Sequence, residues 1–461
     1  MADSSTSAEL VESLRPLLAR MAPGDRLPSS RELIERFRVG PGTVSRAIAV
    51  LIAEGTVVTR PGIGTFVAPR PARPAATPGD TSWQEITLAG REYDPGNAVE
   101  AAHPPLEGGI AMSGGYLHET LQPTRALAAA LARAARRPDA WHRAPTAGLE
   151  PLRAIFARAV GGAVTAQDVL ITGGGQGALS MLFRAVAAPG SPVLMESPTY
   201  PGALAAARAA GLRPIPVPMD DDGVRPDLLA SAFDMTGASL LYCQPTFHNP
   251  TGTVLAPDRR RRIVEVARAA GAFLIEDDFA RHLGHGRPPL APLVADDPDG
   301  TVVHLTSLTK PASPSLRIGA VIARGPVTRR LLGMRYVDDF FVARPLQEAA
   351  IELLSTPAWD RHLQALAGAL RERCAALAGA LARQVPDWTL TRVPEGGLHL
   401  WVRLPSGRQA VAVADAAQAR GVFVNPGNRY FPAEPPDAYL RLSFAAAANI
   451  AELVEGASRL G

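Results

Sequence analysis

The sequence predicts an α/β protein in two parts: a small N-terminal unit, and a mainly parallel sheet domain followed by a smaller C-terminal α+β domain. Three observations predict this. Three helical patterns and a hairpin come first, a proline-rich stretch follows, and the remainder alternates short β-branched runs with alanine-rich helical segments. The predicted boundaries are 1–68 for the N-terminal unit, 69–107 for a linker, 108–335 for the large domain and 336–461 for the small domain.

The first 68 residues have the pattern of a winged helix-turn-helix. Apolar spacing from residue 10 to residue 18 predicts one helix, and the capping box Ser29-Ser30-Arg31-Glu32 starts a second. Pro41 suits the first position of a third helix, which Gly55 ends. Two β-prone runs joined by Arg60-Pro61-Gly62-Ile63-Gly64 then predict a hairpin, the wing.

Such a unit predicts double-stranded DNA as a partner. Between Arg26 and Arg60 six arginines face three acidic residues, an excess that supports phosphate contact. Thr43, Ser45 and Arg46 are expected on the face of the third helix that lies opposite its apolar stripe. Ordinary helix-start chemistry is an alternative explanation for the first two. The other expected contact residues are Arg31, Arg60 and Gly62.

The alternating pattern begins near residue 108 and predicts a sheet that helices cover on both faces. Buried strands are expected at 168–172, 192–195, 239–243, 273–276 and 301–305. Helices are expected at 177–188, 202–210 and 259–270. After about residue 331 long helical patterns lead to the β-prone runs 398–404 and 439–443, which predict the smaller domain.

Composition limits the classes to which the chain can belong. Its 461 residues are 47% hydrophobic and 20% charged, so a disordered chain is excluded. Cys243 and Cys374 form no C-x-x-C pair, which argues against a disulfide framework or a zinc site. No apolar stretch of spanning length and no signal-peptide pattern is present, so we expect a cytoplasmic protein with no membrane partner.

One lysine stands in a chain that otherwise uses arginine. Of 47 basic residues 46 are arginines, and Lys310 is the exception. Genome composition explains the preference for arginine, and a lone lysine could be chance. Arginine keeps its proton in proteins, however, whereas a lysine amine can become neutral and nucleophilic. Lys310 is therefore the candidate catalytic residue.

Residues at predicted strand ends supply the other groups that a pyridoxal phosphate site needs. Lys310 would bind the aldehyde, Asp277 would keep the pyridine nitrogen protonated, and Asn249 would donate to the ring phenolate. Tyr200 would cover a face of the ring. The phosphate needs amides and a cation, for which the candidates are Gly175, Gln176, Ser307, Thr309 and Arg317.

Each of these residues also has an ordinary structural interpretation. Asp277 would fit a solvated acidic corner, the glycines at 173–175 a tight turn, and Asn249 a common Asn-Pro turn. Tyr200 would fit a core and Arg317 a surface. Their order, spacing and shared position at strand ends favour the cofactor site.

The chain resembles two known families on motifs that cover nearly all of it. Residues 112–460 resemble the class I/II aminotransferases of fold type I, on Asn249-Pro250-Thr251-Gly252, Glu276-Asp277-Asp278, Ser307-Leu308-Thr309-Lys310, Arg317-Ile318-Gly319 and Leu440-Arg441-Leu442-Ser443-Phe444. Residues 7–68 resemble a GntR-type winged helix, on Leu27-Pro28-Ser29-Ser30-Arg31-Glu32-Leu33 and Arg60-Pro61-Gly62-Ile63-Gly64-Thr65-Phe66. In this order the two resemble the MocR subfamily of transcriptional regulators.

The resemblance implies a homodimer that binds pyridoxal phosphate, with Arg441 gripping the α-carboxylate of an amino acid. Two departures from the family pattern stand out. The family usually has a tyrosine two positions after the pyridine aspartate, where this chain has Phe279. It also commonly has a tyrosine that reaches the partner subunit's phosphate, in a segment where this chain has Trp141-His142-Arg143. Arg143 is a speculative replacement.

The leading hypothesis is a transcriptional regulator whose effector is an amine or an amino acid. The effector would displace Lys310 from the cofactor, the small domain would shift, and the winged helices would change their grip on DNA. One alternative is an active aminotransferase that retains a DNA-binding head. Another is a regulator whose large domain only dimerises, against which the complete cofactor set argues. Phe279, which lacks a hydroxyl, favours regulation over efficient catalysis.

Overall fold

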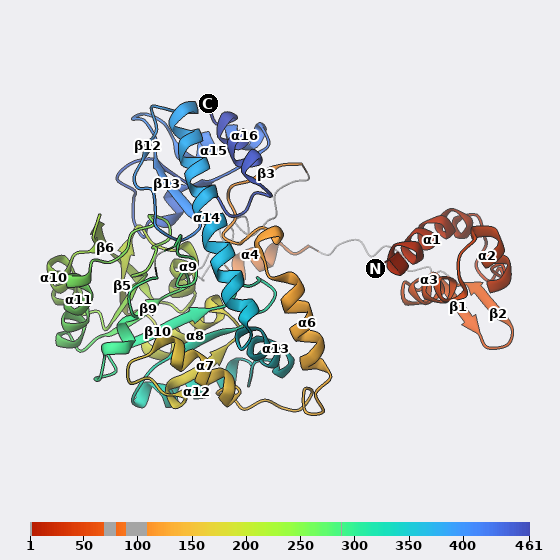
Figure 1. Ribbon diagram of the computed structural model, residues 1–461, viewed down its shortest axis with the longest axis horizontal. Helices are drawn as coiled ribbons and strands as arrows, with labels where there is room; N and C mark the ends of the chain where they lie inside the picture. Colours follow the sequence, from red (N-terminus) through yellow and green to blue (C-terminus); the bar gives the residue numbers. More distant parts are fainter. Residues whose placement is uncertain (1, 69–79, 89–107, 287) are drawn as a thin grey trace. The chain divides into compact units, whose positions relative to one another are not determined.

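A computed structural model describes the chain except for residues 1, 69–79, 89–107 and 287. The chain divides into two compact units, Met1–Gly90 and Arg91–Gly461 (Figure 1). Within the part of the chain that the structure describes, no helix is both long and apolar enough to cross a bilayer. Cys243 and Cys374 are buried and do not form a disulfide.

The N-terminal unit is a winged helix-turn-helix, as its sequence predicts. Its elements are α1 (Ala2–Ala19), α2 (Ser30–Phe37), α3 (Pro41–Ala53), β1 (Val57–Arg60) and β2 (Gly64–Val67). The capping box is formed, because the Ser29 amide donates to Glu32 Oε2 at 2.7 Å and the Glu32 amide donates to Ser29 Oγ at 3.3 Å. Leu14, Leu33 and Leu51 are fully buried at its centre, so the unit has a core of its own.

A short helix, α4 (Ser82–Leu88), lies within the stretch that the sequence assigns to a linker. Trp83 and Ile86 of this helix are exposed. The predicted linker therefore contains regular structure. The rest of that prediction concerns residues 69–79 and 89–107, which lie outside the described residues.

The larger unit is built on an eight-stranded sheet with the order β4-β11-β10-β9-β8-β5-β6-β7. The pairings from β10 through β9, β8 and β5 to β6 are parallel, and the others are antiparallel, which confirms a mainly parallel sheet. Its strands are β4 (Val169–Thr172), β5 (Pro192–Ser197), β6 (Arg213–Asp220), β7 (Gly223–Val224), β8 (Leu240–Cys243), β9 (Phe273–Asp277), β10 (Val302–Ser307) and β11 (Gly319–Ile322).

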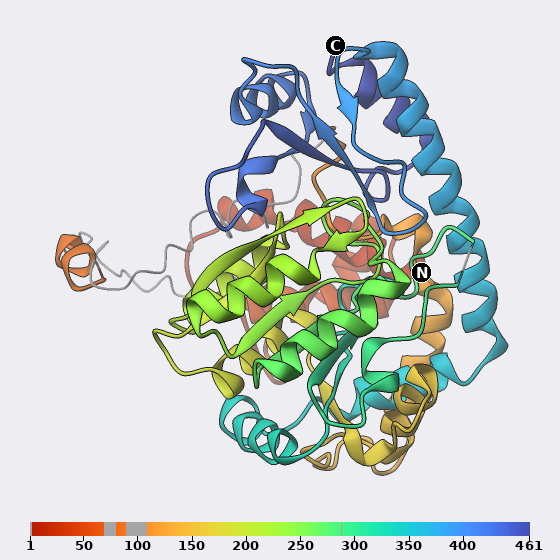
Figure 2. The same ribbon diagram turned by 90° about the vertical axis from the view of Figure 1, so that its left-hand side faces the viewer.

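Helices cover both faces of this sheet (Figure 2). Within β5, Leu194 belongs to one core while Val193 and Met195 belong to the other, because successive side chains of a strand point to opposite faces. The helices of this part are η1 (Glu119–Leu121), α6 (Thr124–Ala135), α7 (Glu150–Val160), η2 (Ala166–Asp168), α8 (Gly175–Val186), α9 (Pro201–Ala209), α10 (Pro226–Thr236), α11 (Pro257–Ala269), η3 (Leu293–Asp296), α12 (Pro326–Asp338) and α13 (Arg344–Leu354).

Strand β6 was not predicted, because Pro214, Pro216 and Pro218 alternate along it. It pairs with β5 along six residues, and with β7 only at Met219 and Asp220. Most of its other edge is therefore unpaired. A strand in this position tolerates proline, because the missing N–H groups can be those that face away from the neighbour.

The smaller lobe packs around a four-stranded sheet with the order β12-β13-β16-β15 and a separate β14–β3 pair. Its elements are β3 (Ile110–Ala111), α14 (Pro357–Gln384), β12 (Thr389–Leu390), β13 (His399–Arg403), α15 (Ala410–Ala419), β14 (Val422–Phe423), β15 (Asn425–Pro426), η4 (Gly427–Tyr430), β16 (Tyr439–Ser443) and α16 (Ile450–Ser458). Helix α14 runs along both lobes (Figure 1). Its Trp359 lies in a large-domain core and its Leu366 in the small-domain core.

The lobes are not divided as simply along the chain as the sequence suggests. The predicted boundary between residues 335 and 336 falls inside α12. Ile110, Met112 and Leu117, which the prediction assigns to the large domain, belong to the core of the small lobe. The small lobe is therefore assembled from both ends of the larger unit.

Candidate functional site

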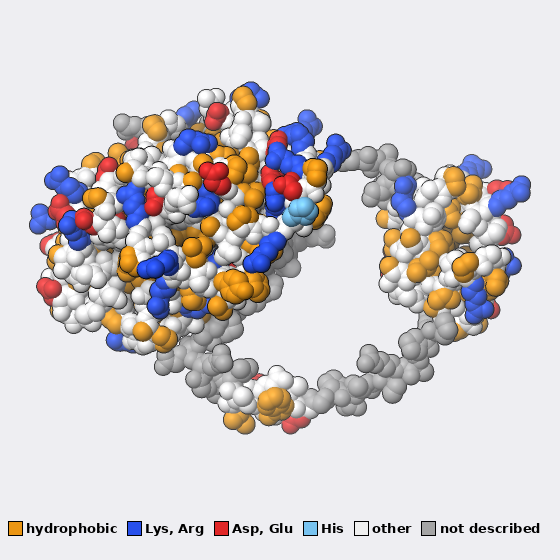
Figure 3. Space-filling model, turned by 90° about the horizontal axis from the view of Figure 1, so that it is seen from below, with side chains coloured by type: hydrophobic (Ala, Val, Ile, Leu, Met, Phe, Trp, Pro, Cys, Tyr) orange, Lys and Arg blue, Asp and Glu red, His pale blue; other side chains and the backbone are white. Residues whose placement is uncertain are grey.

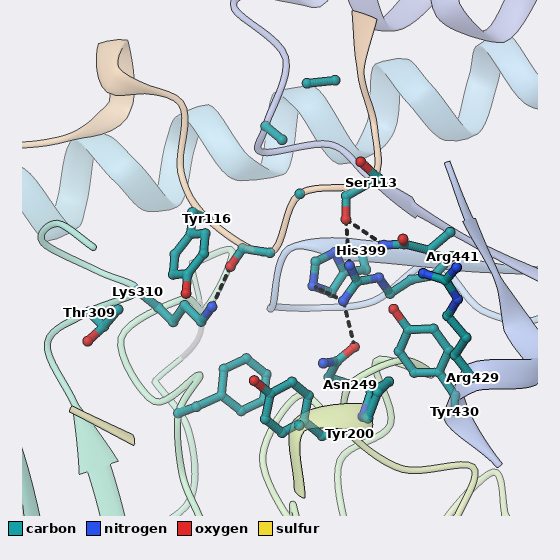
Figure 4. A pocket seen from close by; sticks show the side chains of 18 of the residues that line it. Ser113, Tyr116, Tyr200, Asn249, Thr309, Lys310, His399, Arg429, Tyr430 and Arg441 are labelled. Atoms are coloured by element: carbon teal, nitrogen blue, oxygen red, sulfur yellow. Dashed lines mark hydrogen bonds between the residues drawn. The ribbon is translucent and has the colours of Figure 1, made fainter. Parts of the chain in front are cut away.

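A cavity of about 2170 Å³ in the larger unit collects every residue that the sequence predicts for cofactor and effector binding (Figure 4). These residues come from seven separate stretches of chain, most of them at strand ends. They are Gly175, Gln176, Tyr200, Asn249, Asp277, Ser307, Thr309, Lys310, Arg317 and Arg441. The structure therefore confirms that the strand ends bring these residues together around one cavity.

Lys310 follows strand β10 and directs its amine into the cavity. Nζ donates to the carbonyl oxygen of Gly115 at 2.7 Å and lies 3.7 Å from the centroid of the Tyr116 ring. Burial and the charge of Arg441 lower the pKa of Lys310 to about 7, although Asp277 opposes them. Near neutral pH a large share of this amine is uncharged, as nucleophilic attack on an aldehyde requires.

Asp277 ends strand β9 as a buried carboxylate. Its Oδ2 accepts hydrogen bonds from Tyr242 Oη at 2.7 Å and from Gln244 Nε2 at 3.1 Å. Burial raises the pKa of Asp277 to about 6, against the effect of these two bonds. Both of these hydrogen-bond partners are neutral, so a protonated pyridine nitrogen would supply the positive charge that such a carboxylate favours.

The first turn of α8 and the residues around β10 form a polar pocket without bulky side chains. Gly174 caps the helix with φ +97°, and a Cβ there would lie only 2.9 Å from the Arg317 guanidinium carbon. Ser307 Oγ donates to Thr309 Oγ1 at 2.9 Å. A helix N-terminus beside a guanidinium and two hydroxyls is a suitable site for a phosphate.

Tyr200 and Asn249 line the cavity between these groups. The Tyr200 hydroxyl donates to Gln176 Oε1 at 3.1 Å, and Gln176 Nε2 donates to the Gly202 carbonyl at 2.7 Å. Asn249 Oδ1 accepts from Arg441 at 3.1 Å. The side-chain nitrogen of Asn249, Nδ2, therefore remains to donate to a ring oxygen.

Arg441, on β16, is a buried cation with neutral neighbours. Its guanidinium donates to Asn249 Oδ1 and, at 2.7 Å, to the carbonyl of Ser113, and it lies 3.2 Å from His399 Nε2. Burial and Arg441 hold the pKa of His399 well below its ordinary value, so this imidazole is neutral. Arg441 Nε is buried without a hydrogen-bond partner. A ligand carboxylate would satisfy both that donor and the charge.

Several residues of the cavity were not predicted, namely Ser113, Gly115, Tyr116, Gln244, His399 and Tyr430, and neither was Tyr242, which donates to Asp277 from behind the cavity lining. Tyr430 places its ring 5.2 Å from the Arg441 guanidinium carbon. Tyr242 looks like an ordinary residue of a buried strand, and its contact with Asp277 is visible only once β8 pairs with β9. No local signal in the sequence points to these contacts.

The two departures from the family pattern differ in location. Phe279 lines the cavity, so the position where the family has a hydroxyl faces the site and offers no donor. Trp141 is 75% exposed, and Arg143 lies over the Phe341 ring at 5.9 Å. Neither Trp141 nor Arg143 lines the cavity.

A buried group of ionisable side chains lies beside Asp277. Glu276, Asp278 and His304 are close enough to share a metal ion. His304 Nδ1 lies 2.9 Å from Glu276, however, and Arg281 pairs with Asp278. Since Arg281 already pairs with Asp278, and Arg260 lies 3.8 Å from Glu276, this group is an internal ion-pair network and not a candidate metal centre.

The N-terminal unit exposes most of the residues predicted for DNA contact. Arg31, Ser45, Arg46, Arg60 and Gly62 are all exposed, and Figure 3 shows basic side chains on its surface. The Arg31 side chain is 90% exposed and pairs only loosely with Glu35 at 3.5 Å. Arg60 lies over the Phe66 ring at 5.0 Å, which orients its side chain on the wing.

The expectation that Thr43 faces outward is wrong. Its side chain is buried, with 6% of the residue exposed. Thr43 lies four positions before Ala47, and residues at that spacing share one face of a helix. In α3 that face also carries Val44 and Leu51 and packs into the core, whereas Ser45 lies on the exposed face.

Comparisons with known proteins agree with this architecture. Residues 112–460 match the family described as aminotransferase class I and II, and residues 6–67 match the bacterial regulatory proteins of the gntR family. The HTH-type pyridoxine biosynthesis transcriptional regulator PdxR of Corynebacterium glutamicum is 30% identical over 434 residues, 93% of this chain and 89% of its own. The probable rhizopine catabolism regulatory protein MocR of Rhizobium meliloti is 27% identical over 96% of this chain and 91% of its own.

A solved structure also matches most of the chain. LysN, the α-aminoadipate aminotransferase of Thermus thermophilus, complexed with N-(5'-phosphopyridoxyl)-L-leucine, has a TM-score of 0.75 and 31% identity. The match covers 82% of this chain and 97% of that one. The two regulators match 96% and 93% of this chain, so their matches extend into both units. The chain therefore belongs to the MocR subfamily of GntR-type transcriptional regulators, in which a DNA-binding winged helix-turn-helix precedes an aminotransferase class I/II domain.

Proposed function

We propose that this regulator binds pyridoxal phosphate in its large cavity and uses it to sense an amine or an amino acid. When bound, pyridoxal phosphate supplies an aldehyde that reacts with primary amines and a pyridine ring that withdraws electrons. The observation that carries the proposal is Lys310, whose pKa of about 7 leaves much of its amine neutral inside a cavity large enough for cofactor and effector.

The other groups have distinct proposed roles. Asp277, oriented by Tyr242 and Gln244, would hold a proton on the pyridine nitrogen. Tyr200 would lie against the ring and Asn249 would donate to its phenolate oxygen. The remaining predicted residues would bind the phosphate, namely Gly175, Gln176, Ser307, Thr309 and Arg317.

Arg441 indicates the chemical class of the effector. Its unpartnered Nε and its neutral neighbours favour a ligand that brings a negative charge. An amino acid would present its amine to the cofactor and its carboxylate to this guanidinium. LysN, the related aminotransferase, is itself complexed with a phosphopyridoxyl derivative of an amino acid. We therefore favour an amino acid over a simple amine.

The regulator would act as a homodimer in the cytoplasm, where the DNA that its head binds is found. A group of large exposed side chains on the larger unit supports the dimer. Tyr336, Val337 and Phe340 at the end of α12 are 49–76% exposed, and Tyr336 stacks edge-on against Phe340 with ring centroids 4.9 Å apart. Apolar groups that gather on a surface commonly mark an interface.

An aminotransferase that keeps a DNA-binding head is the second candidate. The cavity contains the lysine, aspartate and arginine that such an enzyme needs, and the match to this chain covers 97% of LysN. Phe279 argues against efficient turnover. Without a hydroxyl at this position, only Asn249 would donate a hydrogen bond to the phenolate oxygen of the ring. The proton shifts of transamination depend on how strongly that oxygen is stabilised.

The proposal is tested by the absorption spectrum of the full-length protein with pyridoxal phosphate. We expect a band in the near ultraviolet or visible that borohydride makes permanent, that changes with the right amino acid, and that accompanies a change in affinity for the upstream DNA. Lys310→Ala should fold and lose the covalent link, since the side chain is only partly buried. A wild-type protein that takes up no pyridoxal phosphate would contradict the proposal.

A further inference from the structure

The segment Ser113–Tyr116, which we name the bridging segment, contacts both groups by which the site is proposed to hold its ligands (Figure 4). The Lys310 amine donates to the Gly115 carbonyl at 2.7 Å and lies 3.7 Å from the Tyr116 ring centroid. Arg441 donates to the Ser113 carbonyl at 2.7 Å. One short stretch of chain thus occupies the lysine and the arginine together.

The bridging segment belongs to the small lobe. Just before it, the Met112 amide donates to the Phe423 carbonyl at 2.9 Å, and the Met112 carbonyl accepts from the Ser443 amide at 2.7 Å. Just after it, the His118 amide donates to the Ala445 carbonyl at 2.8 Å. Lys310, in contrast, follows a strand of the large sheet, so its contacts with Gly115 and Tyr116 join the two lobes.

The two contacts of Lys310 depend on its being a protonated or at least free amine. A cation is attracted to the face of an aromatic ring, and the bond to Gly115 requires an N–H donor. Condensation with an aldehyde consumes the free amine on which both contacts depend. The nitrogen forms a double bond to the aldehyde carbon, and the aldehyde oxygen leaves as water with the two hydrogens of the neutral amine.

We propose that Tyr116 is a positioning residue that, with the Gly115 carbonyl, holds the Lys310 amine in the cofactor-free protein. Binding of the cofactor then releases the bridging segment from the large domain. This rests on the proposed function and adds a means of regulation to it. The bridging segment follows, in the chain, the residues that connect the DNA-binding unit to the larger unit.

The pH dependence of the amine gives the test its readout. The titratable and charged groups that face Lys310 come from several elements and are Tyr116, Tyr200, Asp277, Arg317, His399 and Arg441. Asp277 favours the ammonium form, whereas Arg317 and Arg441 oppose it. The face of the Tyr116 ring also favours the ammonium form. Without the ring of Tyr116, the amine should become neutral at lower pH, by about one unit for a partly desolvated contact.

The experiment compares three full-length proteins: wild type, Tyr116→Leu, and Tyr116→Phe as the matched control that keeps the ring. The rate of pyridoxal phosphate uptake is measured by absorbance across pH. We expect the midpoint for Tyr116→Leu to lie about one unit lower, so that its uptake is about twice as fast at pH 7 and about five times as fast at pH 6, while Tyr116→Phe follows the wild type. Tyr116 is 46% exposed, so neither substitution removes a core side chain.

Hydrogen exchange of residues 112–118 gives a second measurement. We expect faster exchange in the cofactor-loaded wild type than in the cofactor-free form, and fast exchange in both forms of Tyr116→Leu. If the wild type takes up the cofactor but all three proteins share one pH midpoint, or if loading slows exchange in this segment, the inference fails alone. If the wild type takes up no cofactor, the proposed function fails with it.

Discussion

At the scale of single residues, the site is defined by buried ionisable side chains that have no oppositely charged partner in direct contact. Burial lowers the pKa of Lys310 to about 7 and raises the pKa of Asp277 to about 6, so in both cases it favours the uncharged form. Arg441 is buried among neutral groups with one donor unsatisfied. A folded protein keeps such unbalanced groups at a cost in stability, which a ligand of matching charge recovers.

Substituting Arg441 separates the classes of effector. Arg441→Ala should weaken a carboxylate-bearing effector by roughly 2–5 kcal/mol, because a buried charge pair is lost. The matched control is the corresponding amine without the carboxylate, whose affinity should change little. Titration of the cofactor's absorption band with both ligands measures this. Equal loss for both ligands would mean that Arg441 supports the fold of the cavity and does not bind the carboxylate.

Phe279 separates regulator from enzyme. Phe279→Tyr would restore a hydroxyl at a position that lines the cavity, and keto-acid production with the effector amino acid should rise roughly tenfold or more for one hydrogen bond to a charged oxygen. Phe279→Leu, which also lacks the hydroxyl, should show no such rise. Single-turnover and steady-state assays would report both. Efficient wild-type turnover, with no gain from tyrosine, would favour the enzyme.

At the scale of elements, α3 and the wing determine what the head offers to DNA. Helix α3 buries Val44, Ala47 and Leu51 and therefore presents Ser45 and Arg46 to the outside. Gly62 has φ +73° and open space where a Cβ would lie, so it lets the wing turn tightly beside Arg60. The exposed surface of the head thus follows from which face of α3 is apolar.

Salt dependence of DNA binding tests this assignment. Arg31→Ala and Arg46→Ala should each weaken binding, and each lost phosphate contact should reduce the slope of log K against log salt by about 0.9. Arg31→Ala should do so evenly across DNA sequences if it contacts only phosphate. Arg261→Ala is the matched control, since its side chain is 89% exposed on the larger unit. Unchanged affinity and slope in both head variants would remove these residues from the interface.

At the scale of the whole molecule, the two units have separate cores. Leu33 is buried in the core of the head. Among the described residues, the cores of the large and small lobes contain none from the head. Units with separate cores can unfold independently. A ligand that binds one of them should then stabilise that unit selectively.

Calorimetry of the full-length protein should therefore show two transitions, of which pyridoxal phosphate raises only that of the larger unit. At 100 times its dissociation constant the cofactor should add about 2.7 kcal/mol, a shift on the order of 5 °C. Leu33→Ala identifies the other transition, since it should destabilise the head by about 2–5 kcal/mol and leave the cofactor effect unchanged. A single transition that the cofactor and Leu33→Ala both move would show that the units unfold together.

The sequence by itself determined the features that depend on neighbouring residues. The capping box at Ser29, the start of α3 at Pro41 and the alternation of buried strands with helices are local patterns, and the structure contains each of them. Strand ends on one edge of a parallel sheet must lie together, so the gathering of Lys310 and Asp277 followed from the pattern as well.

Only the tertiary structure decided the contacts between distant parts of the chain. Gly115 and Lys310 are 195 residues apart, and His399 and Arg441 meet because β13 and β16 pair. The burial of Thr43 likewise depended on which neighbours α3 packs against. Local periodicity specifies the faces of an element but not the element that covers each face. The groups that hold the lysine amine and surround the buried arginine therefore became visible only when the lobes were brought together.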